Sequence, residues 1–459
     1  MMKLPEDFLN RMQTLLKDEY EIFLQSITNE EPTRGLRINT RKIKVEDFLN
    51  SFDTSLKQVP FDENFYFIPH HWLLGNHPYF HGGAMYLQEP SAALPALSVE
   101  VKEDFKVLDL CAAPGGKTSQ ILSKLNSGFL IANEINFNRA KVLAGNIERL
   151  GYQNAIVTNN KPEDFLKDYK NFFDLVIVDA PCSGEGMFRK DEEAIKNWNI
   201  TNVLSCAIRQ NDILKVAAQL VKQKGQIVYS TCTYAIEENE EVVKNFLREH
   251  PDFKLVEVRD EVKQNTSPAI DLEYARRVWP HKNIGEGHFI AVMENTLETA
   301  VHYGYKYPRS KISSSVIKEL KEELGQVIVD INYHNIYLLK DNFHLIPFSL
   351  PPIDNLKVML AGVKVGSFNK YRRFMIDHQL SHAFSISNYK NVINYSLEDS
   401  EVSDYLAGYE IITSQIINKE YALISVNGVA LGFGKNVNGT IKNYYPKGLR
   451  NLVKKFEKY

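Results

Sequence analysis

The chain is poor in several features that would assign it to a specialised class of protein. Its 459 residues include only four cysteines, at positions 111, 182, 206 and 232, and no C-x-x-C pair. This spacing argues against a disulfide framework and a structural zinc site, and it favours a cytoplasmic setting. No apolar run approaches the ~18 residues of a membrane span, and residues 1–10 lack a secretory core. We therefore expect no membrane partner.

Excess charge of one sign is also missing. The formal net charge is −3, which by itself does not indicate a nucleic-acid partner. The basic residues are nevertheless grouped, at 34–44, at 364–373 and at 435–459, where Tyr444 and Tyr445 lie among lysines. One such group is usually a solvated face. Three groups, two of them interleaved with aromatic residues, favour contact with RNA phosphates and bases.

The sequence patterns divide the chain into five segments. Residues 1–90 mix helical and strand-like patterns and end in a histidine-rich stretch without metal-ligand spacing. Residues 91–295 alternate short Val/Ile/Leu-rich runs with amphipathic helices, as βαβ units on a parallel sheet do. Residues 296–315 are typical of a linker, 316–378 predict a small mixed α/β module, and 379–459 predict a compact β-rich module.

Six apolar runs within the second segment predict the strands of the parallel sheet. Amphipathic patterns between them predict helices, for example over 139–150, 203–221 and 237–250. The predicted strands are 106–110, 129–133, 155–158, 174–179, 226–231 and 288–293.

The loop after the first predicted strand reads C-A-A-P-G-G-K-T, over residues 111–118. Gly115 and Gly116 allow the backbone to approach a ligand closely. Two other readings remain open: a plain structural turn, and a P-loop, because G-G-K-T resembles the end of G-x-x-x-x-G-K-[ST]. Against a P-loop, Cys111 occupies the position of its first glycine, and Pro114 has no amide to offer a phosphate.

Polar residues follow the ends of the neighbouring predicted strands, where open α/β sheets bind ligands. Glu134 follows the second strand, and an acid there can accept hydrogen bonds from both hydroxyls of a ribose. Asp179 and Cys182 follow the fourth strand, and Cys232 follows the fifth. A ribose acid beside a loop without G-x-G-x-x-G fits S-adenosylmethionine better than a nicotinamide cofactor.

Two cysteines at neighbouring strand ends suggest covalent catalysis on a pyrimidine. A thiolate that adds to cytosine carbon 6 makes carbon 5 enamine-like, so that carbon 5 can attack a sulfonium methyl group. An acid such as Asp179 can hydrogen-bond the cytosine edge and favour proton uptake at the ring nitrogen. The target base has to leave its stack to reach such a site. A lone cysteine is more often a small buried hydrophobe, which is the role expected for Cys206 and considered for Cys111.

Taken in order, these motifs resemble the RNA cytosine-5 methyltransferases of the Nop/Sun type, which include the bacterial RsmB and RsmF group. The matching segments are C-A-A-P-G-G-K-T, N-E-I-N-F-N-R-A, V-D-A-P-C-S-G-E-G-M-F-R-K-D and Y-S-T-C-T-Y-A-I-E-E-N-E. R-G-L-R-I-N-T-R-K and Y-L-Q-E-P-S-A before them, and W-P-H and G-E-G-H-F-I-A after them, extend the likeness. L-G-F-G-K and N-Y-Y-P-K-G-L-R resemble the PUA-like end of the RsmF branch.

The resemblance implies a class I S-adenosylmethionine-dependent methyltransferase core of the Rossmann-like α/β class. An N-terminal α/β RNA-binding extension and C-terminal mixed and PUA-like β-rich modules would flank this core. The implied activity is methylation of cytosine carbon 5 in the decoding region of 16S rRNA, with the 30S subunit or its precursor as partner of a monomer. The same chemistry on tRNA or 23S rRNA remains open, as does a non-catalytic ribosome-assembly factor.

The resemblance also assigns roles to single residues. Cys232 would be the nucleophile, Cys182 would assist proton removal or product release, and Asp179 would contact the target cytosine beside the cofactor. The family usually has an Asp after the third strand to contact the adenine, and Asn159 or Asn160 takes that place here. No metal ligand is implied. The residues expected to hold S-adenosylmethionine are Cys111, Ala112, Ala113, Pro114, Gly115, Gly116, Lys117, Glu134, Arg139, Asn160 and Asp179.

Overall fold

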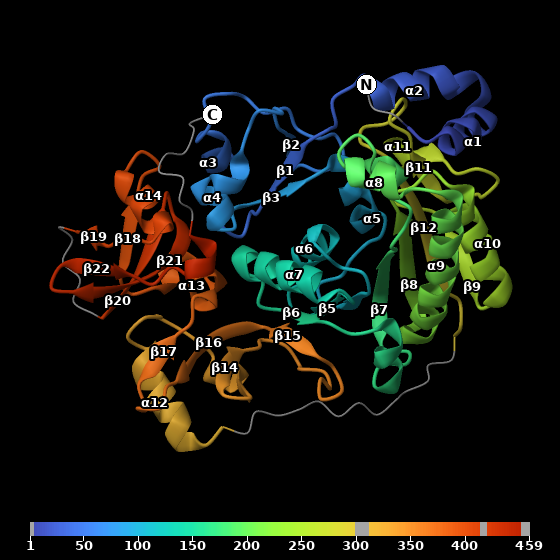
Figure 1. Ribbon diagram of the computed structural model, residues 1–459. Coiled ribbons are helices and arrows are strands. Elements are labelled where there is room, and N and C mark those ends of the chain that lie inside the picture. Colours follow the sequence, from blue (N-terminus) through green and yellow to red (C-terminus); the bar gives the residue numbers. More distant parts are fainter. Residues whose placement is uncertain (1–3, 299–311, 414–419, 451–459) are drawn as a thin grey trace.

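The computed structural model describes residues 4–298, 312–413 and 420–450, which form four β-sheets flanked by helices (Figure 1). Most of the linker predicted at 296–315 lies outside these described residues. No helix within the described ranges combines the length and the apolar character needed to cross a membrane.

The N-terminal segment carries a small antiparallel sheet of order β2-β1-β3. Phe8 of α1 and Phe23 of α2 pack against Trp198, Tyr234 and Trp279 of the following segment. These two helices therefore pack against the segment that follows the small sheet rather than against the small sheet itself. The elements are α1 (Glu6–Leu16), α2 (Tyr20–Thr28), β1 (Gly35–Ile38), α3 (Val45–Leu49), β2 (Phe65–Phe67), α4 (Pro78–His81) and β3 (Met85–Gln88).

The core of the molecule is a ten-stranded sheet of order β10-β11-β12-β8-β7-β4-β5-β6-β15, with β9 also paired to β12. Strands β4 to β8 of this sheet are parallel, whereas β12 and β15 run antiparallel to their neighbours. The strands are β4 (Lys106–Asp109), β5 (Phe129–Asn133), β6 (Ala155–Thr158), β7 (Phe173–Asp179), β8 (Val221–Thr231), β9 (Phe253–Val256), β10 (Ser267–Pro268), β11 (Arg276–Val278), β12 (His288–Asn295) and β15 (Val358–Ala361).

Helices cover both faces of this sheet, because its strands are apolar on both sides. Side chains such as Leu108 and Val176 form one core with α9 and α10, and the alternating Val107 and Leu175 form a second core with α5, α6 and α7. The helices are α5 (Leu94–Leu97), α6 (Gly116–Leu122), α7 (Phe137–Leu150), α8 (Glu192–Asn197), α9 (Ile200–Leu220), α10 (Glu240–Glu249) and α11 (Asp260–Gln264).

The predicted strands are all present, and two of them, 129–133 and 155–158, agree at both ends. The expectation that the strand at 288–293 belongs to a parallel sheet is wrong, because β12 runs antiparallel to β8. The helix expected from 237 begins instead at Glu240. Residues Ile236–Glu238 form a 3-10 turn, and Asn239 holds the preceding loop by accepting from Thr231 Oγ1 at 2.6 Å and donating to the Thr233 carbonyl at 2.9 Å.

The segment that begins at residue 312 contributes a four-stranded antiparallel sheet of order β13-β14-β16-β17. One strand of the same stretch, β15, is not part of this sheet. It pairs with β6 at the edge of the large sheet. Leu360 and Ala361 are buried there, so that β15 covers the edge of β6. The remaining elements are α12 (Ser314–Leu324), β13 (Ile336–Leu339), β14 (Asn342–Leu345), β16 (Val363–Phe368) and β17 (Phe374–Ile376).

The last segment is a five-stranded sheet of order β18-β20-β21-β22-β19. It packs against the N-terminal sheet and α4, as Figure 1 shows, and the two share one buried cluster that includes Leu36, Tyr79 and Ile424. A Cβ atom at Gly82 would lie 2.3 Å from Val429 Cγ1, so this close approach requires glycine. The elements are α13 (Gln379–Ala383), β18 (Val392–Tyr395), α14 (Ser400–Ala407), β19 (Ile411–Ile412), β20 (Tyr421–Val426), β21 (Val429–Val437) and β22 (Thr440–Asn443).

The basic group at 34–44 is not one RNA-facing surface. Arg37 is buried and donates to Ser119 Oγ at 2.7 Å and to the Gly116 carbonyl at 3.1 Å. Lys42 donates to the carbonyl of His382 in the last segment. These two side chains connect parts of the protein, and the interpretation of the whole group as phosphate contacts is wrong for them. Arg41 and Lys44 are exposed.

Candidate active site

Two cysteine side chains meet at the carboxyl end of the large sheet. Asp179 ends β7 and Cys182 follows it, whereas Cys232 follows β8, which is parallel to β7. The Sγ atoms of Cys182 and Cys232 are 3.3 Å apart, and the amide of Cys232 donates to Cys182 Sγ at 3.4 Å. The sequence-based prediction that both strand ends lie at one site therefore agrees with the distance between the two sulfur atoms.

An ion pair lies beside the two sulfur atoms. Lys117 Nζ of α6 donates to Asp179 Oδ2 at 2.7 Å, and Ser230 Oγ donates to Oδ1 at 2.7 Å. Burial alone would raise the pKa of Asp179, but Lys117 outweighs it and holds this pKa below the usual value. Burial opposes the charge of Lys117, yet Asp179 raises the pKa of its amine above the usual value. Both groups are therefore charged near neutral pH.

The environment of Cys182 favours its protonated form. The neighbouring Cys232 sulfur, together with burial, raises the pKa of the Cys182 thiol well above its usual value. Only the thiolate form of a cysteine is a strong nucleophile. Cys182 thus suits the role of a protonated partner that can direct its S–H toward Cys232.

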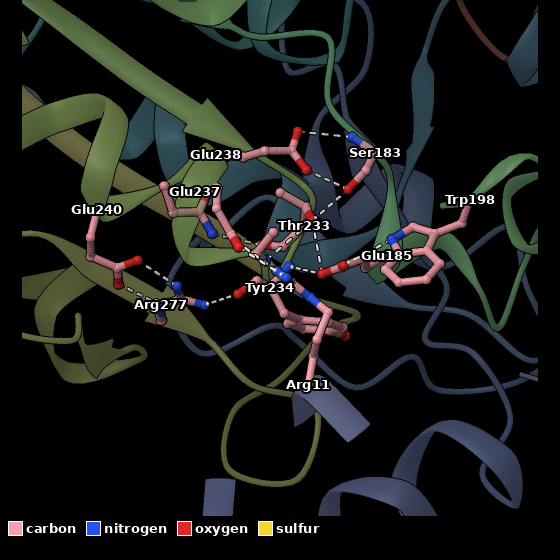
Figure 2. A network of polar contacts seen from close by, with 12 residues as sticks. Arg11, Ser183, Glu185, Trp198, Thr233, Tyr234, Glu237, Glu238, Glu240 and Arg277 are labelled. Atoms are coloured by element: carbon pink, nitrogen blue, oxygen red, sulfur yellow. Dashed lines mark hydrogen bonds and ion pairs between the residues drawn. The ribbon is translucent and has the colours of Figure 1, made fainter. Parts of the chain in front are cut away.

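Buried carboxylates connect the loop that contains Cys182 to the loop that contains Cys232, and Figure 2 shows their contacts. Glu185 accepts from Thr233 Oγ1 at 2.9 Å, from the amide of Tyr234 at 2.8 Å and from Trp198 Nε1 at 2.9 Å. The adjacent chain segment is anchored by the amide of Gly186, which donates to the Cys232 carbonyl at 2.8 Å. These contacts fix the position of Cys232 relative to the loop that carries Cys182.

Glu238 makes a second connection of this kind. It accepts from the amide of Ser183 at 3.0 Å and from Gln210 Nε2 at 2.8 Å, and Ser183 Oγ also donates to it. Burial raises the pKa of Glu238 to about 7. The sequence analysis did not assign a role to Glu185 or Glu238. Both follow a cysteine within a matching motif, but sequence alone does not show that they are buried.

A buried ion pair supports the loop from the other side. Arg277 and Glu240 are both essentially unexposed, and Arg277 Nε and Nη2 donate to Glu240 at 2.7 and 2.5 Å. Arg277 Nη1 also donates to the carbonyl of Tyr234 at 2.9 Å, as Figure 2 shows. The position of the loop after Cys232 therefore depends on a pair of charges that water does not reach.

Replacing Arg277 by methionine is expected to lower the free energy of unfolding by about 3–5 kcal/mol, because Glu240 would keep a buried charge without a partner. Urea unfolding measures the change, with Arg248→Met on the exposed end of α10 as the control. The double variant Arg277→Met/Glu240→Met should recover much of the loss. A double variant no more stable than the single one would contradict this account.

The cofactor side of the site is built around Glu134 at the end of β5. Glu134 is buried, accepts from the amide of Asn136 at 2.8 Å and lies 3.4 Å from Arg139 Nη1. Arg139 also donates to the carbonyl of Ala113 at 2.8 Å and thereby connects Glu134 to the loop over 111–117. Gly115 has a φ of 111°, a conformation that favours glycine at the start of α6.

Hydrogen bonds between the backbone of the loop and the neighbouring elements hold Ala112 and Pro114 in place. The amide of Ala112 donates to the Asn133 carbonyl at 2.9 Å, and Asn146 Nδ2 donates to the Pro114 carbonyl at 2.9 Å. Cys111 packs against the sheet core, and burial raises the pKa of its thiol. The prediction that Cys206 is a buried packing residue is confirmed, since it is 4% exposed.

Donor and acceptor chemistry at the loop fits S-adenosylmethionine, which carries positive charge at its sulfonium and ammonium groups. Asp109 is buried, and its Oδ1 has no hydrogen-bond partner among the described residues. Burial raises the pKa of Asp109 to about 7. Asp179 is ionised nearby, and Glu134 offers a carboxylate for the two ribose hydroxyls.

The two asparagines after β6 already have partners in the protein. Asn159 Nδ2 donates to the carbonyls of Glu134 and Ile135 at 2.8 Å, and its Oδ1 accepts from Lys357 Nζ at 2.8 Å. Asn160 Oδ1 accepts from the amide of Lys357 at 2.9 Å. Both side chains hold the strand edge beside β15, and the contact of Asn160 with the adenine stays a prediction.

Comparison with known proteins matches three successive segments of the chain to families of methyltransferase domains. Residues 4–90 match the N-terminal domain of 16S rRNA methyltransferase RsmF, residues 96–294 match 16S rRNA methyltransferase RsmB/F, and residues 392–451 match the methyltransferase RsmF PUA domain. Ribosomal RNA small subunit methyltransferase F of Vibrio atlanticus is 31% identical over 464 residues, which cover 97% of each chain. The chain belongs to the RsmF family. The corresponding protein of Vibrio campbellii is 32% identical, again over 97% of each chain.

Membership of the RsmF family confirms the predicted class I S-adenosylmethionine-dependent methyltransferase fold, the choice of cofactor and the C-terminal PUA module. Among solved structures, a methyltransferase homolog protein from Pyrococcus horikoshii is 26% identical with a TM-score of 0.52 and covers 64% of this chain and 96% of that one. NSun6 from the same organism, with SFG, is 22% identical with a TM-score of 0.57 and covers 64% and 99%. At this sequence identity, the similarity to NSun6 shows a shared fold alone.

Proposed function

We propose that this RsmF-family protein transfers the methyl group of S-adenosylmethionine to carbon 5 of a cytosine in 16S rRNA, through a covalent bond between Cys232 and cytosine carbon 6. The observation that carries the proposal is the 3.3 Å distance between the sulfur atoms of Cys182 and Cys232, beside the Lys117–Asp179 ion pair. The choice of RNA is supported by the relatives, which are named small subunit ribosomal RNA methyltransferases.

The first task of the site is to make carbon 5 nucleophilic. When bound, S-adenosylmethionine supplies an electrophilic methyl group. The Cys232 thiolate forms a bond to carbon 6, and the electron pair of the 5,6 double bond becomes available at carbon 5. The ring nitrogen takes up one proton as the adduct forms, which balances the proton that the Cys232 thiol loses, and it gives this proton up again when the adduct breaks down. Asp179, kept ionised by Lys117, stabilises this protonated edge by accepting its hydrogen bond.

The second task is to remove the carbon-5 proton and release the product. A base accepts the carbon-5 proton, and the electron pair of the broken carbon–hydrogen bond re-forms the 5,6 double bond. The carbon–sulfur bond breaks at the same time, and its electron pair returns to the Cys232 sulfur. Once Cys232 is bonded to carbon, its sulfur no longer opposes ionisation of Cys182, the main cause of the raised Cys182 pKa. Cys182 can then lose its own proton to solvent, and its thiolate accepts the carbon-5 proton in the step after methyl transfer.

Methyl transfer from labelled S-adenosylmethionine tests the proposal directly. Purified 30S subunits, 50S subunits, naked rRNA and tRNA serve as substrates, and mass spectrometry maps the modified nucleotide. We expect 5-methylcytidine in 16S rRNA. Methylation at another atom would overturn the covalent chemistry, and product only on tRNA or 23S rRNA would overturn the choice of RNA.

Replacing Glu134 by glutamine is expected to weaken binding of S-adenosylmethionine about 10- to 100-fold, because a hydrogen bond to a charged group is lost at the ribose. Isothermal titration calorimetry of the cofactor measures the change without requiring RNA. Glu249→Gln is a matched control, since Glu249 is exposed at the end of α10 and pairs with Lys215. Unchanged affinity in Glu134→Gln would show that this carboxylate does not contact the cofactor.

A further inference from the structure

Three residues that were given no role above, Glu89, Ser91 and His288, are connected by hydrogen bonds beside the two cysteines. His288 is the first residue of β12, and the next residue, Phe289, pairs with Thr231 of β8. His288 therefore lies at the strand position opposite Cys232. Its Nδ1 is 2.9 Å from Ser91 Oγ, and Ser91 Oγ lies 2.6 Å from Glu89 Oε2. Ser91 is unexposed and His288 is 7% exposed.

The hydrogen bonds of this chain determine which nitrogen of His288 carries the proton. Glu89 accepts from the amides of Ser91, Ala92 and Glu286 at 2.8, 2.9 and 3.2 Å, and from Ser91 Oγ. A serine hydroxyl has one proton, and Ser91 gives it to Glu89. Ser91 Oγ must then accept from His288 Nδ1–H. The other ring nitrogen, Nε2, consequently carries a lone pair and acts as an acceptor.

The ring of His288 lies close to charged groups of the active site. His288 lies among the charged groups Lys117, Asp179 and Lys190, and burial lowers its pKa to about 3, so that the ring is neutral. Its Nε2 is neither fully buried nor hydrogen-bonded to any residue of the described part of the chain. A neutral ring with this low basicity is a poor proton acceptor in acid–base catalysis, but it remains a good hydrogen-bond acceptor.

We propose that His288 is the specificity-determining residue that accepts a hydrogen bond from the exocyclic amino group of the target cytosine, with Glu89 and Ser91 as positioning residues that fix its tautomer. The inference rests on the proposed function, and it names the group that distinguishes the substrate base. Uracil presents a carbonyl oxygen where cytosine presents the amino group. Two acceptors would then face each other in a buried site, which disfavours uracil.

The test compares two changes alone and together, in the Cys232→Ala background so that no covalent bond forms. One change is His288→Phe, which keeps a ring but removes the acceptor. The other is in the RNA, where 2-pyrimidinone, which lacks the amino group, replaces the mapped target cytosine. With His288 present, we expect loss of the amino group to weaken binding about 10- to 100-fold. With His288→Phe, the same loss should change affinity by less than about twofold.

Ser91→Ala provides a second route that leaves the histidine in place. Without the serine acceptor the ring is free to carry its proton on Nε2, so the preference for cytosine over 2-pyrimidinone should fall severalfold. Ser98→Ala is the matched control, because Ser98 is also buried but its hydroxyl donates to the Pro95 carbonyl. We expect Ser98→Ala to keep the full preference for cytosine.

Equal effects of the RNA change with and without the histidine acceptor would overturn the proposal, as would an unchanged preference in Ser91→Ala. Failure of the proposed function is distinguishable from these results. It would appear as absence of 5-methylcytidine with the unaltered protein, whereas failure of the His288 inference alone would leave that product intact.

Discussion

Cys232→Ala is expected to reduce methyl transfer by at least about 10⁴-fold, because the variant lacks the thiolate that forms the bond to cytosine carbon 6. Binding of S-adenosylmethionine should stay unchanged, since the loop over 111–117 and Glu134 do not depend on this sulfur. Incorporation of labelled methyl groups into 30S subunits measures the first effect, and calorimetry measures the second.

Cys206→Ala is the matched control for this experiment. Cys206 is also a free cysteine, but it is a buried residue of α9 and does not follow a strand end. We expect it to keep methyl transfer within about twofold and to lower the free energy of unfolding by about 1 kcal/mol, because a buried sulfur atom is removed. Full activity in Cys232→Ala would show that carbon 6 is attacked by another group or is not attacked at all.

Cys182→Ala is expected to give the second largest effect, of a different kind. Methyl transfer still occurs once, but the carbon-5 proton lacks its acceptor, so the RNA stays bonded to Cys232 and turnover falls about 10²- to 10⁴-fold. A denaturing gel should show an RNA–protein band that carries labelled methyl. The double variant Cys182→Ala/Cys232→Ala should show no band. Normal turnover without a band in the single variant would rule out this role.

The parts of the site that sequence predicted are those that follow strand ends. Glu134, Asp179 and Cys232 each come directly after an apolar run, and parallel strands bring such positions to one edge. Periodicity therefore predicted both the sheet and the sulfur pair. It could not show that β12 is antiparallel, because an apolar strand pattern has no direction.

The parts that sequence missed depend on contacts between distant segments. Ser91 and His288 are 197 positions apart, and Ser183 and Glu238 are 55 apart, so no local pattern signals either pair. The pattern of charged residues in the sequence does not show which of them are buried. Arg37 and Lys42 belong to a basic group that favours RNA contact, yet they are used to hold the catalytic core and the last segment against the N-terminal sheet.

The buried cluster shared by the two ends of the chain has a consequence for how the protein is made. Leu36 and Tyr79 pack in one cluster with residues such as Ile424, which the ribosome adds much later. At a synthesis rate of about 5–20 residues per second, the N-terminal sheet waits on the order of tens of seconds with one apolar face uncovered. Until then the nascent chain offers chaperones a binding surface that the finished enzyme does not have.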